Sequence, residues 1–280
     1  MLYVPNTEQL RLLRAVVDRC RQEEEEFRRA VPAGKTSEPM QACWLAPPGT
    51  GKTQCFLWIS ELFEKVNQWE MGVQFQMTAS QNTMASAVHG ETNHTWGEVP
   101  INLGEGGAPP LRKNKDGIST LFLGCTLLRW LCIDEISTSA LIVLGIMESN
   151  VRKACKRHLH ALDKDGEPRP WGGLNVITGG DWWQLPPVKA KAIFRNPFAK
   201  DYVGPERRVM NMFWHMDGFA LPNRRQHLYE LTVQNRSKDK WLVEVLRQNR
   251  VGDESFTVRV QGVPPMGYRG PSQLAYFQKS

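Results

Sequence analysis

Two periodicities of hydrophobic and polar residues alternate along this chain, and each change of period predicts a change of element. From residue 7 to residue 29, apolar residues recur at helical spacing: Leu10, Leu13, Val16 and Val17. This spacing predicts a helix that has Thr7 as its N-cap and a solvent-facing run of glutamates at residues 23–26. A linker follows at residues 31–38.

Strand-like and helical patterns then alternate. Nearly continuous apolar runs are typical of central parallel strands, and three occur here: residues 42–45, 127–133 and 174–177. Apolar and polar side chains alternate over residues 73–77, which predicts a further strand. Helical spacing at residues 56–66 and 138–157 lies between these strands. The order predicts an α/β fold, a mostly parallel sheet with helices on both faces.

Composition limits the function classes only weakly. The chain has 280 residues, 41% of them hydrophobic, a net charge of +6 and a pI near 9.0, which fits a polyanionic partner without requiring one. Its six cysteines form no CxxC pair and mostly lie in apolar runs, so we expect reduced, buried thiols and an intracellular protein. No apolar run predicts a membrane span. Cys155, His158 and His160 lack a second pair of metal ligands, and we interpret them as a solvated basic helix end.

A glycine-rich loop stands between the first strand and the next helix, at residues 46–53. In such a loop, backbone N–H groups surround the β-phosphate of a nucleotide at a helix N-terminus. The predicted cradle comprises Pro48, Gly49, Thr50, Gly51, Lys52 and Thr53. We expect Lys52 to reach the β- and γ-phosphates and Thr53 to hold Mg²⁺. Ala46 replaces the usual first glycine, which is compatible with the loop if its φ is negative. The loop predicts a nucleotide triphosphatase.

Two later strands end in polar residues that fit the same chemistry. Asp134 and Glu135 follow an apolar run; Asp134 would hold Mg²⁺ through water, and Glu135 would orient or deprotonate the attacking water. The alternative is a carboxylate pair that caps the next helix. After the following strand, Gln184 could sense the γ-phosphate. Trp182 and Trp183 could stack on bases or pack in the core or an interface.

Together with residues 231–236, these segments resemble the superfamily-one DNA helicases of the petite-integration-frequency (PIF) type. Residues 180–188 are similar to the third motif of that family, with tryptophan at both usual phenylalanine positions. The resemblance covers about residues 6–252 and implies the first RecA-like P-loop NTPase domain, with an exposed insertion at about residues 98–120. It implies ATP and Mg²⁺ as cofactors and single-stranded DNA or DNA junctions as partners.

The same resemblance implies roles for four further residues. Gln9 would select ATP by reading adenine, although a surface glutamine at a helix start is the alternative. Thr92 and His94 would help to bind single-stranded DNA. Arg236 would approach the γ-phosphate as an arginine finger supplied in cis, the alternative being an exposed arginine at a helix start.

Residues 253–280 are too few for the second RecA-like domain of that family, and we expect an irregular tail there. The chain would then be a fragment, a truncated gene model or a product that needs a second polypeptide. The implied function is the motor part of an ATP-dependent DNA helicase that translocates on and unwinds DNA in repair, recombination or telomere maintenance. The family implies the nucleus, with the mitochondrion as an alternative. A P-loop ATPase switch without unwinding and a degenerate, non-hydrolysing remnant are the competing hypotheses.

Overall fold

The computed structural model describes residues 4–101, 120–156, 158–214, 228–234 and 239. The chain divides into two units, Met1–Val233 and Gln234–Ser280. In the second unit only Gln234 and Asp239 are described, so the architecture reported below is that of the first.

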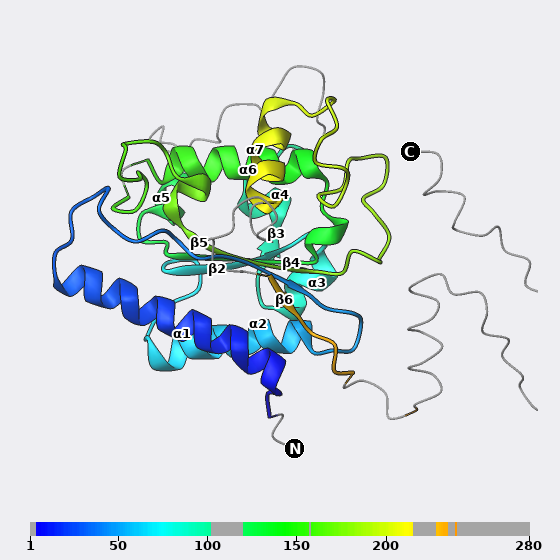
Figure 1. Ribbon diagram of the computed structural model, residues 1–280, viewed down its shortest axis with the longest axis horizontal. Helices are drawn as coiled ribbons and strands as arrows, with labels where there is room; N and C mark the ends of the chain where they lie inside the picture. Colours follow the sequence, from blue (N-terminus) through cyan, green and yellow to red (C-terminus); the bar gives the residue numbers. More distant parts are fainter. Residues whose placement is uncertain (1–3, 102–119, 157, 215–227, 235–238, 240–280) are drawn as a thin grey trace, which may run out of the picture. The chain divides into compact units, whose positions relative to one another are not determined.

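Six parallel strands form the sheet of the first unit (Figure 1). They are β1 Gln41–Leu45, β2 Phe75–Ala79, β3 Glu91–Thr92, β4 Trp130–Asp134, β5 Asn175–Gly180 and β6 Leu228–Glu230, in the order β3-β2-β4-β5-β1-β6. The register pairs Ala79 with Asp134 and Leu45 with Gly180. The segments that follow β1, β2, β4 and β5 therefore leave the sheet at one edge, where ligands of such sheets bind.

Helices cover both faces of this sheet, as the sequence predicts. Figure 1 shows one face covered by α1 Thr7–Arg28 and α2 Lys52–Glu61, which continues into the π-helical turn η1 Leu62–Val66. The other face carries α4 Asn93–Trp96, α5 Thr120–Cys125, α6 Leu141–Ala154 and α7 Gly204–Trp214. Three shorter elements complete the described unit: α3 Asn82–Ala87 and the 3₁₀ turns η2 Ile136–Thr138 and η3 Pro170–Gly173. Within the described ranges, no helix has the length and apolar character that crossing a membrane requires.

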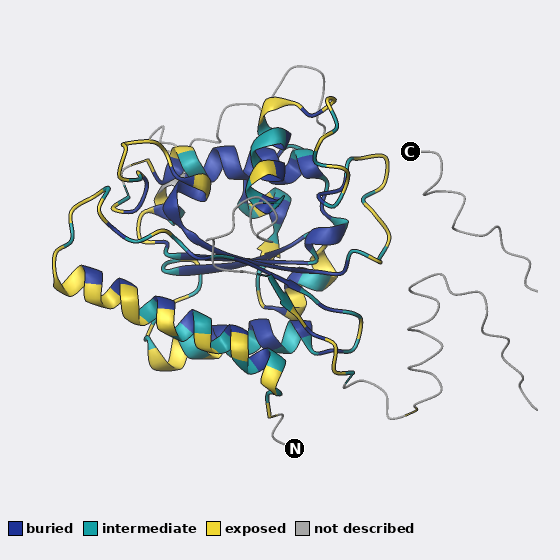
Figure 2. Ribbon diagram, viewed as in Figure 1, coloured by how far each residue is buried: buried dark blue, intermediate teal, exposed yellow. Residues whose placement is uncertain are grey.

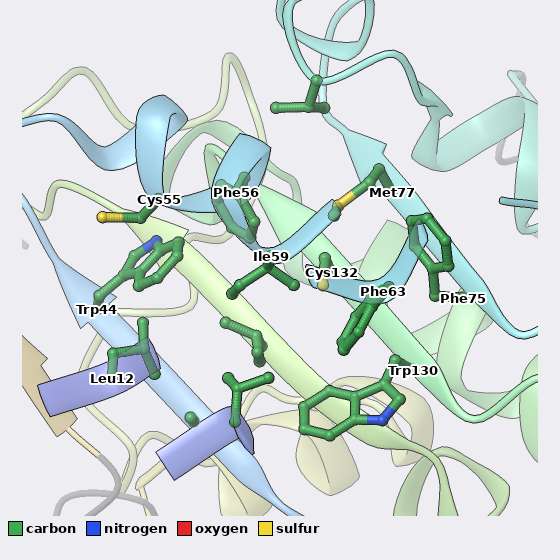
Figure 3. Packing of buried hydrophobic residues seen from close by; sticks show 14 of the residues in the cluster. Leu12, Trp44, Cys55, Phe56, Ile59, Phe63, Phe75, Met77, Trp130 and Cys132 are labelled. Carbon is green, nitrogen blue, oxygen red and sulfur yellow. The ribbon is translucent and has the colours of Figure 1, made fainter. Parts of the chain in front are cut away.

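Successive residues of a strand point to opposite faces of the sheet. Nearly all residues of β1, β4 and β5 are buried, so both faces of the sheet are covered (Figure 2). Ala42 and Trp44 pack with α1 and α2, whereas Cys43 between them packs with residues of α6 and α7. Large apolar side chains fill the first of these layers, among them Leu12, Trp44, Phe56, Phe63 and Trp130 (Figure 3). Burying each such side chain contributes about 1.5–3 kcal/mol. This packing fixes the strand ends that carry the site.

Two expectations for α1 are wrong. Its N-cap is Asn6 and not Thr7: the Asn6 Oδ1 accepts from the Gln9 backbone N–H at 3.0 Å, and the Gln9 Oε1 accepts from the Asn6 N–H at 2.9 Å. Thr7 lies inside the helix because this reciprocal capping box satisfies two helix-start donors at once. The run of glutamates does not face the solvent as a whole, since Glu23 and Glu26 are buried.

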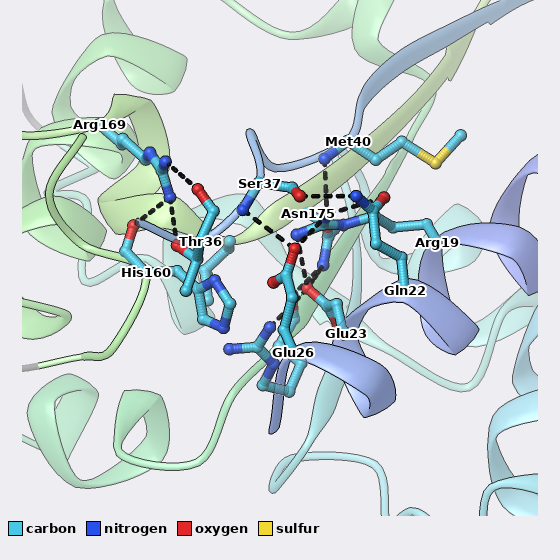
Figure 4. Close-up of polar contacts among 12 residues, drawn as sticks. Arg19, Gln22, Glu23, Glu26, Thr36, Ser37, Met40, His160, Arg169 and Asn175 are labelled. Carbon is cyan, nitrogen blue, oxygen red and sulfur yellow. Dashed lines mark hydrogen bonds and ion pairs between the residues drawn. The ribbon is translucent and has the colours of Figure 1, made fainter. Parts of the chain in front are cut away.

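Those two glutamates belong to a polar cluster at the amino ends of β1, β4 and β5 (Figure 4). Asn175 lies at its centre. Its Oδ1 accepts from the Met40 N–H at 2.8 Å and from the Arg19 Nε at 2.9 Å, and its Nδ2 donates to Glu23 at 2.7 Å. Arg129 also donates to Glu23, at 2.5 Å. The cluster therefore fastens α1 to the sheet at the edge opposite the glycine-rich loop.

His158 and His160 lie near this cluster, so the expectation of a solvated basic helix end is wrong. His160 is buried, and burial together with the charge of Arg129 lowers its pKa to about 2. The same two causes lower the pKa of His158 to about 4. Both imidazoles are therefore neutral at physiological pH.

Candidate nucleotide-binding site

The glycine-rich loop joins β1 to α2 at the carboxyl edge of the sheet. Ala46 is buried, keeps a negative φ, and donates its N–H to the Gly180 carbonyl at 3.0 Å, so alanine fits where the usual pattern has glycine. Gly49 and Gly51 have φ values of 90° and 88°, a region that favours glycine. Gly51 is the N-cap of α2 and Lys52 is its first residue. The loop therefore ends at a helix N-terminus, where backbone N–H groups can bind a phosphate.

Lys52 brings the loop and the acidic pair together. Its side chain is largely buried, and its Nζ lies 3.2 Å from Oδ1 of Asp134 and donates to Oε1 of Glu135. The Asp134 Oδ1 also accepts from the Glu135 backbone N–H at 2.8 Å. Glu135 occupies the N-cap position of the short turn η2, but its side chain makes no capping hydrogen bond there, and α6 begins six residues later with Ala140 as its N-cap. The carboxylates therefore do not cap the next helix.

Glu135 has two properties of a general base. Burial raises the pKa of its carboxyl above the usual range, although the neighbouring Lys52 ammonium acts in the opposite direction. Its Oε2 is buried and has no hydrogen-bond partner among the described residues, while Oε1 accepts from Lys52. A raised pKa and a second carboxylate oxygen that can accept a proton are what activation of a water requires.

The segment after β5 packs tightly against the turn that follows Glu135. The Asp181 N–H donates to Oγ of Ser137 at 3.3 Å. A Cβ on Gly180 would lie 2.9 Å from the Ile136 Cγ2 and 3.1 Å from the Ser137 backbone N, so only glycine permits this approach. Gln184 is half-buried in a turn closed by its own N–H, which donates to the Asp181 carbonyl at 3.0 Å. The structure thus places Gln184 at the sheet edge that carries the glycine-rich loop. It stands three residues after Asp181, which contacts Ser137.

The two tryptophans of this segment differ. Trp182 packs in the core against Phe194 and Phe213, with ring centroids 5.6 and 5.0 Å apart. Trp183 is exposed over 59% of its surface. Packing in the core therefore accounts for the tryptophan at position 182. It does not account for the exposed Trp183.

Gln9 is buried, which excludes the alternative of a surface glutamine. Its Nε2 donates to the carbonyl of Thr50 at 3.0 Å, while its Oε1 accepts from Asn6. The carboxamide therefore contacts the glycine-rich loop directly, and adenine reading by Gln9 stays a prediction.

The predicted DNA-binding residues lie where β3 leads into α4. Thr92 is the N-cap of α4, and its Oγ1 accepts from the Thr95 N–H at 3.1 Å. His94 is half-buried, with its Nδ1 3.2 Å from the Val99 carbonyl oxygen. Strands β2, β4 and β5 separate β3 from β1, so these residues are not part of the nucleotide cradle. Arg236 lies outside the described residues.

Sequence reasoning missed two sets of contacts. Ser137, Thr138 and Ser139 contact three different segments, and their only signal is a run of hydroxyls that begins one residue after the acidic pair. Glu8 accepts from the backbone N–H of Thr232 at 2.7 Å, from its Oγ1 at 2.5 Å and from the Val233 N–H at 3.3 Å. These partners are more than 220 residues apart in sequence, so no local pattern could reveal them.

A parallel sheet with a glycine-rich loop after β1 and an Asp-Glu pair at the carboxyl end of β4 defines the class of RecA-like P-loop domains. Within that class, the chain belongs to the PIF1-like helicase family, whose family model matches residues 20–201. The PIF-type resemblance is thereby confirmed. Among curated proteins, the ATP-dependent DNA helicase Pif1 of Bdellovibrio bacteriovorus is 26% identical over 211 residues, which cover 75% of this chain and 40% of the relative.

Solved structures show the same fold. A Bacteroides Pif1 helicase in complex with ADP-AlF3 and single-stranded DNA matches with a TM-score of 0.56 and 20% identity over 90% of this chain and 47% of that chain. The Pif1 helicase of Candida albicans matches with a TM-score of 0.55 and 21% identity over 90% of this chain and 45% of that chain. This chain therefore spans less than half the length of these relatives.

Proposed function

We propose that this chain is the nucleotide-hydrolysing part of an ATP-dependent DNA helicase. The observation that carries the proposal is the position of Lys52, which lies at the helix N-terminus of a phosphate-binding loop and contacts both Asp134 and Glu135. Membership of the PIF1-like family supports it, as does the Bdellovibrio relative that is named an ATP-dependent DNA helicase.

The residues at the carboxyl edge divide the work on ATP. Backbone N–H groups of residues 49–53 bind the phosphates, with Pro48 beside them in the loop, and Lys52 moves from the carboxylates to the β- and γ-phosphates. The Thr53 hydroxyl and the Asp134 carboxylate are oxygen ligands of the kind that Mg²⁺ prefers. When bound, Mg²⁺ neutralises charge on the phosphate oxygens. Once Lys52 has moved, Glu135 is released to orient the attacking water and to accept its proton.

Three further residues complete the proposed nucleotide site. Gln184 and Arg236 would sense the γ-phosphate, and Gln9 would read adenine. The support for Gln184 is its turn at the same sheet edge, and for Gln9 its contact with the Thr50 carbonyl. Arg236 rests on the family resemblance alone.

Single-stranded DNA or a DNA junction is the proposed polymer substrate. Thr92 and His94 would contact it, and related Pif1 structures hold single-stranded DNA or are described at forked double-stranded DNA. Translocation and unwinding would also require a second RecA-like domain, supplied by a longer form of this chain or by a second polypeptide. Roles in repair, recombination or telomere maintenance, in the nucleus or the mitochondrion, rest on family membership alone.

Steady-state ATP hydrolysis by the full chain, with and without single-stranded DNA, tests the proposal, with Lys52→Ala measured in parallel. We expect DNA-stimulated turnover that disappears in the variant. Turnover that ignores DNA would favour an ATPase switch without unwinding. Turnover no greater than that of Lys52→Ala would refute the proposal in favour of a non-hydrolysing remnant.

A further inference from the structure

Three consecutive hydroxyl residues follow the acidic pair, and each contacts a different segment of the domain. We call Ser137, Thr138 and Ser139 the hydroxyl triplet. The Ser137 Oγ accepts from the Asp181 N–H at 3.3 Å. The Thr138 Oγ1 and the Ser80 Oγ are 2.6 Å apart, and the Ser139 Oγ accepts from the Asn93 Nδ2 at 3.0 Å. A turn of three residues thus meets three separate elements through its side chains.

The triplet also holds the backbone of Glu135. The carbonyl of Glu135 accepts from the N–H of Thr138 at 3.1 Å and from its Oγ1 at 3.0 Å. Glu135 has a φ of 51°, a left-handed conformation that a glutamate adopts only when its surroundings impose it. Because the single hydroxyl proton of Thr138 goes to Glu135, Ser80 is the donor in the 2.6 Å contact with Thr138, which takes precedence over its longer 3.8 Å contact with the Met84 Sδ. Ser80, Thr138 and Glu135 therefore form a directed chain of hydrogen bonds.

One of these contacts ends inside the segment proposed to bind DNA, because Asn93 stands between Thr92 and His94. Ser80 directly follows β2, whose last residue, Ala79, pairs with Thr92. Asn93 is 1% exposed, so its side chain does not face a polymer but points to Ser139. This buried amide therefore links the start of α4 directly to the hydroxyl triplet.

We propose that the hydroxyl triplet consists of positioning residues that couple DNA at Thr92 and His94 to the orientation of the Glu135 carboxylate. The inference rests on the proposed function and names its regulation. Glu135 accepts from Lys52, the residue proposed to bind the β- and γ-phosphates, so DNA that reorients Glu135 would change the affinity for nucleotide. Coupling between binding sites is reciprocal, so nucleotide would change the affinity for DNA by the same factor. The triplet therefore has an effect on binding that can be measured without any turnover.

Thr138→Val tests this coupling, because valine keeps the branched shape and removes the hydroxyl that joins Ser80 to Glu135. The matched control is Thr178→Val, which removes a buried hydroxyl that donates to the Ala42 carbonyl at 3.3 Å and is not part of the triplet. The measured quantity is the Kd of a fluorescent oligo-dT for the full chain, without nucleotide and with a saturating non-hydrolysable ATP analogue and Mg²⁺.

We expect the nucleotide to change the Kd of the wild-type protein at least about fivefold, the lower end of typical coupling. In Thr138→Val the Kd without nucleotide should stay within about twofold of the wild-type value, a tolerance well below the roughly fivefold effect of nucleotide. Adding nucleotide should no longer change the Kd of this variant. Thr178→Val should keep the effect. Ser139→Ala removes the acceptor of the Asn93 amide and should reduce the effect of nucleotide on the Kd by breaking the contact between the triplet and α4. This second variant replaces Thr138→Val if the latter does not fold.

The inference is overturned if both triplet variants keep the wild-type nucleotide effect, or if the wild-type Kd does not respond to nucleotide. Turnover is measured separately. If the wild-type protein does not hydrolyse ATP, the proposed function fails, while the binding cycle still decides whether the triplet couples the two sites.

Discussion

One ammonium group, that of Lys52, spans both carboxylates of the candidate site, with its Nζ 3.2 Å from the Asp134 Oδ1 and in hydrogen-bond contact with Glu135. Lys52 therefore has two roles that it cannot fulfil at the same time. It neutralises the acidic pair in the structure described above, and it must leave that pair to bind phosphate.

Replacing Lys52 with alanine leaves two largely buried carboxylates side by side without a cation. We expect the free energy of unfolding near neutral pH to fall by about 3 kcal/mol, as when one partner of a buried ion pair is removed. Urea denaturation measures the change. Lys65→Ala is the control, because its pair with Glu61 is exposed and should be worth less than about 0.5 kcal/mol. Equal losses in both variants would contradict the role assigned to Lys52.

Stability should depend on pH through Glu135, whose pKa burial raises. A carboxyl with a raised folded-state pKa keeps its proton in the native protein after the unfolded chain has lost it. Its stabilising effect is present below the unfolded-state pKa and is lost as the pH rises through the folded-state pKa. Each unit of pKa difference corresponds to about 1.4 kcal/mol.

Glu135→Gln has no such proton to lose, so its free energy of unfolding should rise relative to wild type as the pH increases above the unfolded-state pKa of about 4.3. Urea denaturation at several pH values in that range measures the difference. Glu24→Gln, at an exposed glutamate paired with Arg28, should show no comparable trend. If the free energy of unfolding of Glu135→Gln instead falls relative to wild type as the pH rises, the charge of Lys52 has a larger effect on the pKa of Glu135 than burial does.

Gly180→Ala should damage the site through packing alone. The added methyl group would lie 2.9 Å from the Ile136 Cγ2 and 3.1 Å from the Ser137 backbone N, both in the turn after Glu135. We expect a loss of about 1–3 kcal/mol in the free energy of unfolding. ATP turnover by the folded fraction should fall as well, because the turn that holds Glu135 must move.

The matched variant for this test is Gly124→Ala in α5. A methyl group there meets no heavy atom within 4 Å in the described part of the chain, so alanine should be neutral or slightly stabilising in a helix. Thermal unfolding and ATP turnover of the two variants can be compared directly. Wild-type turnover in Gly180→Ala would show that the turn tolerates displacement.

Asn175→Ala should lower stability without altering nucleotide binding. It removes the partner of the Met40 N–H, of Arg19 and of Glu23 in a buried cluster, which should cost about 2–3 kcal/mol. The cluster lies at the sheet edge opposite the glycine-rich loop, so the folded variant should bind ADP like the wild type. Gln22→Ala removes an exposed bond to Ser37 and one part-buried bond from Arg19, so it should cost clearly less than Asn175→Ala. Weaker ADP binding by folded Asn175→Ala would contradict the separation of the two edges.

The four central strands, β1, β2, β4 and β5, and the glycine-rich loop could be predicted because their signals are local, whereas the edge strands β3 and β6 were not predicted. Apolar runs such as residues 174–177 have few alternatives to a buried strand, and the spacing of Gly49, Gly51 and Lys52 follows from the geometry of a phosphate-binding loop. The family resemblance then identified a domain that the fold and the family model confirm.

What could not be predicted depends on partners distant in sequence. Glu23 reads as a surface residue until Arg129 and Asn175 are placed beside it, 106 and 152 residues further along the chain. Local sequence does not distinguish Asn6 from Thr7 as the N-cap of α1, because both are good capping residues and only the reciprocal bond between Asn6 and Gln9 decides. The hydroxyl triplet is likewise defined by three segments that the fold brings together.

The buried cysteines lie in different packing layers of this domain. Their reaction with a thiol reagent can therefore report when each layer becomes exposed to solvent. Cys55 and Cys132 lie in the layer under α1 and α2, Cys125 and Cys155 in the layer under α6, and Cys43 beside α7. Burial raises the pKa of the Cys43 and Cys55 thiols to about 12, so they are nearly inert toward alkylating reagents while the fold is closed. The order in which these thiols become labelled would therefore show which face of the sheet separates first when the domain unfolds.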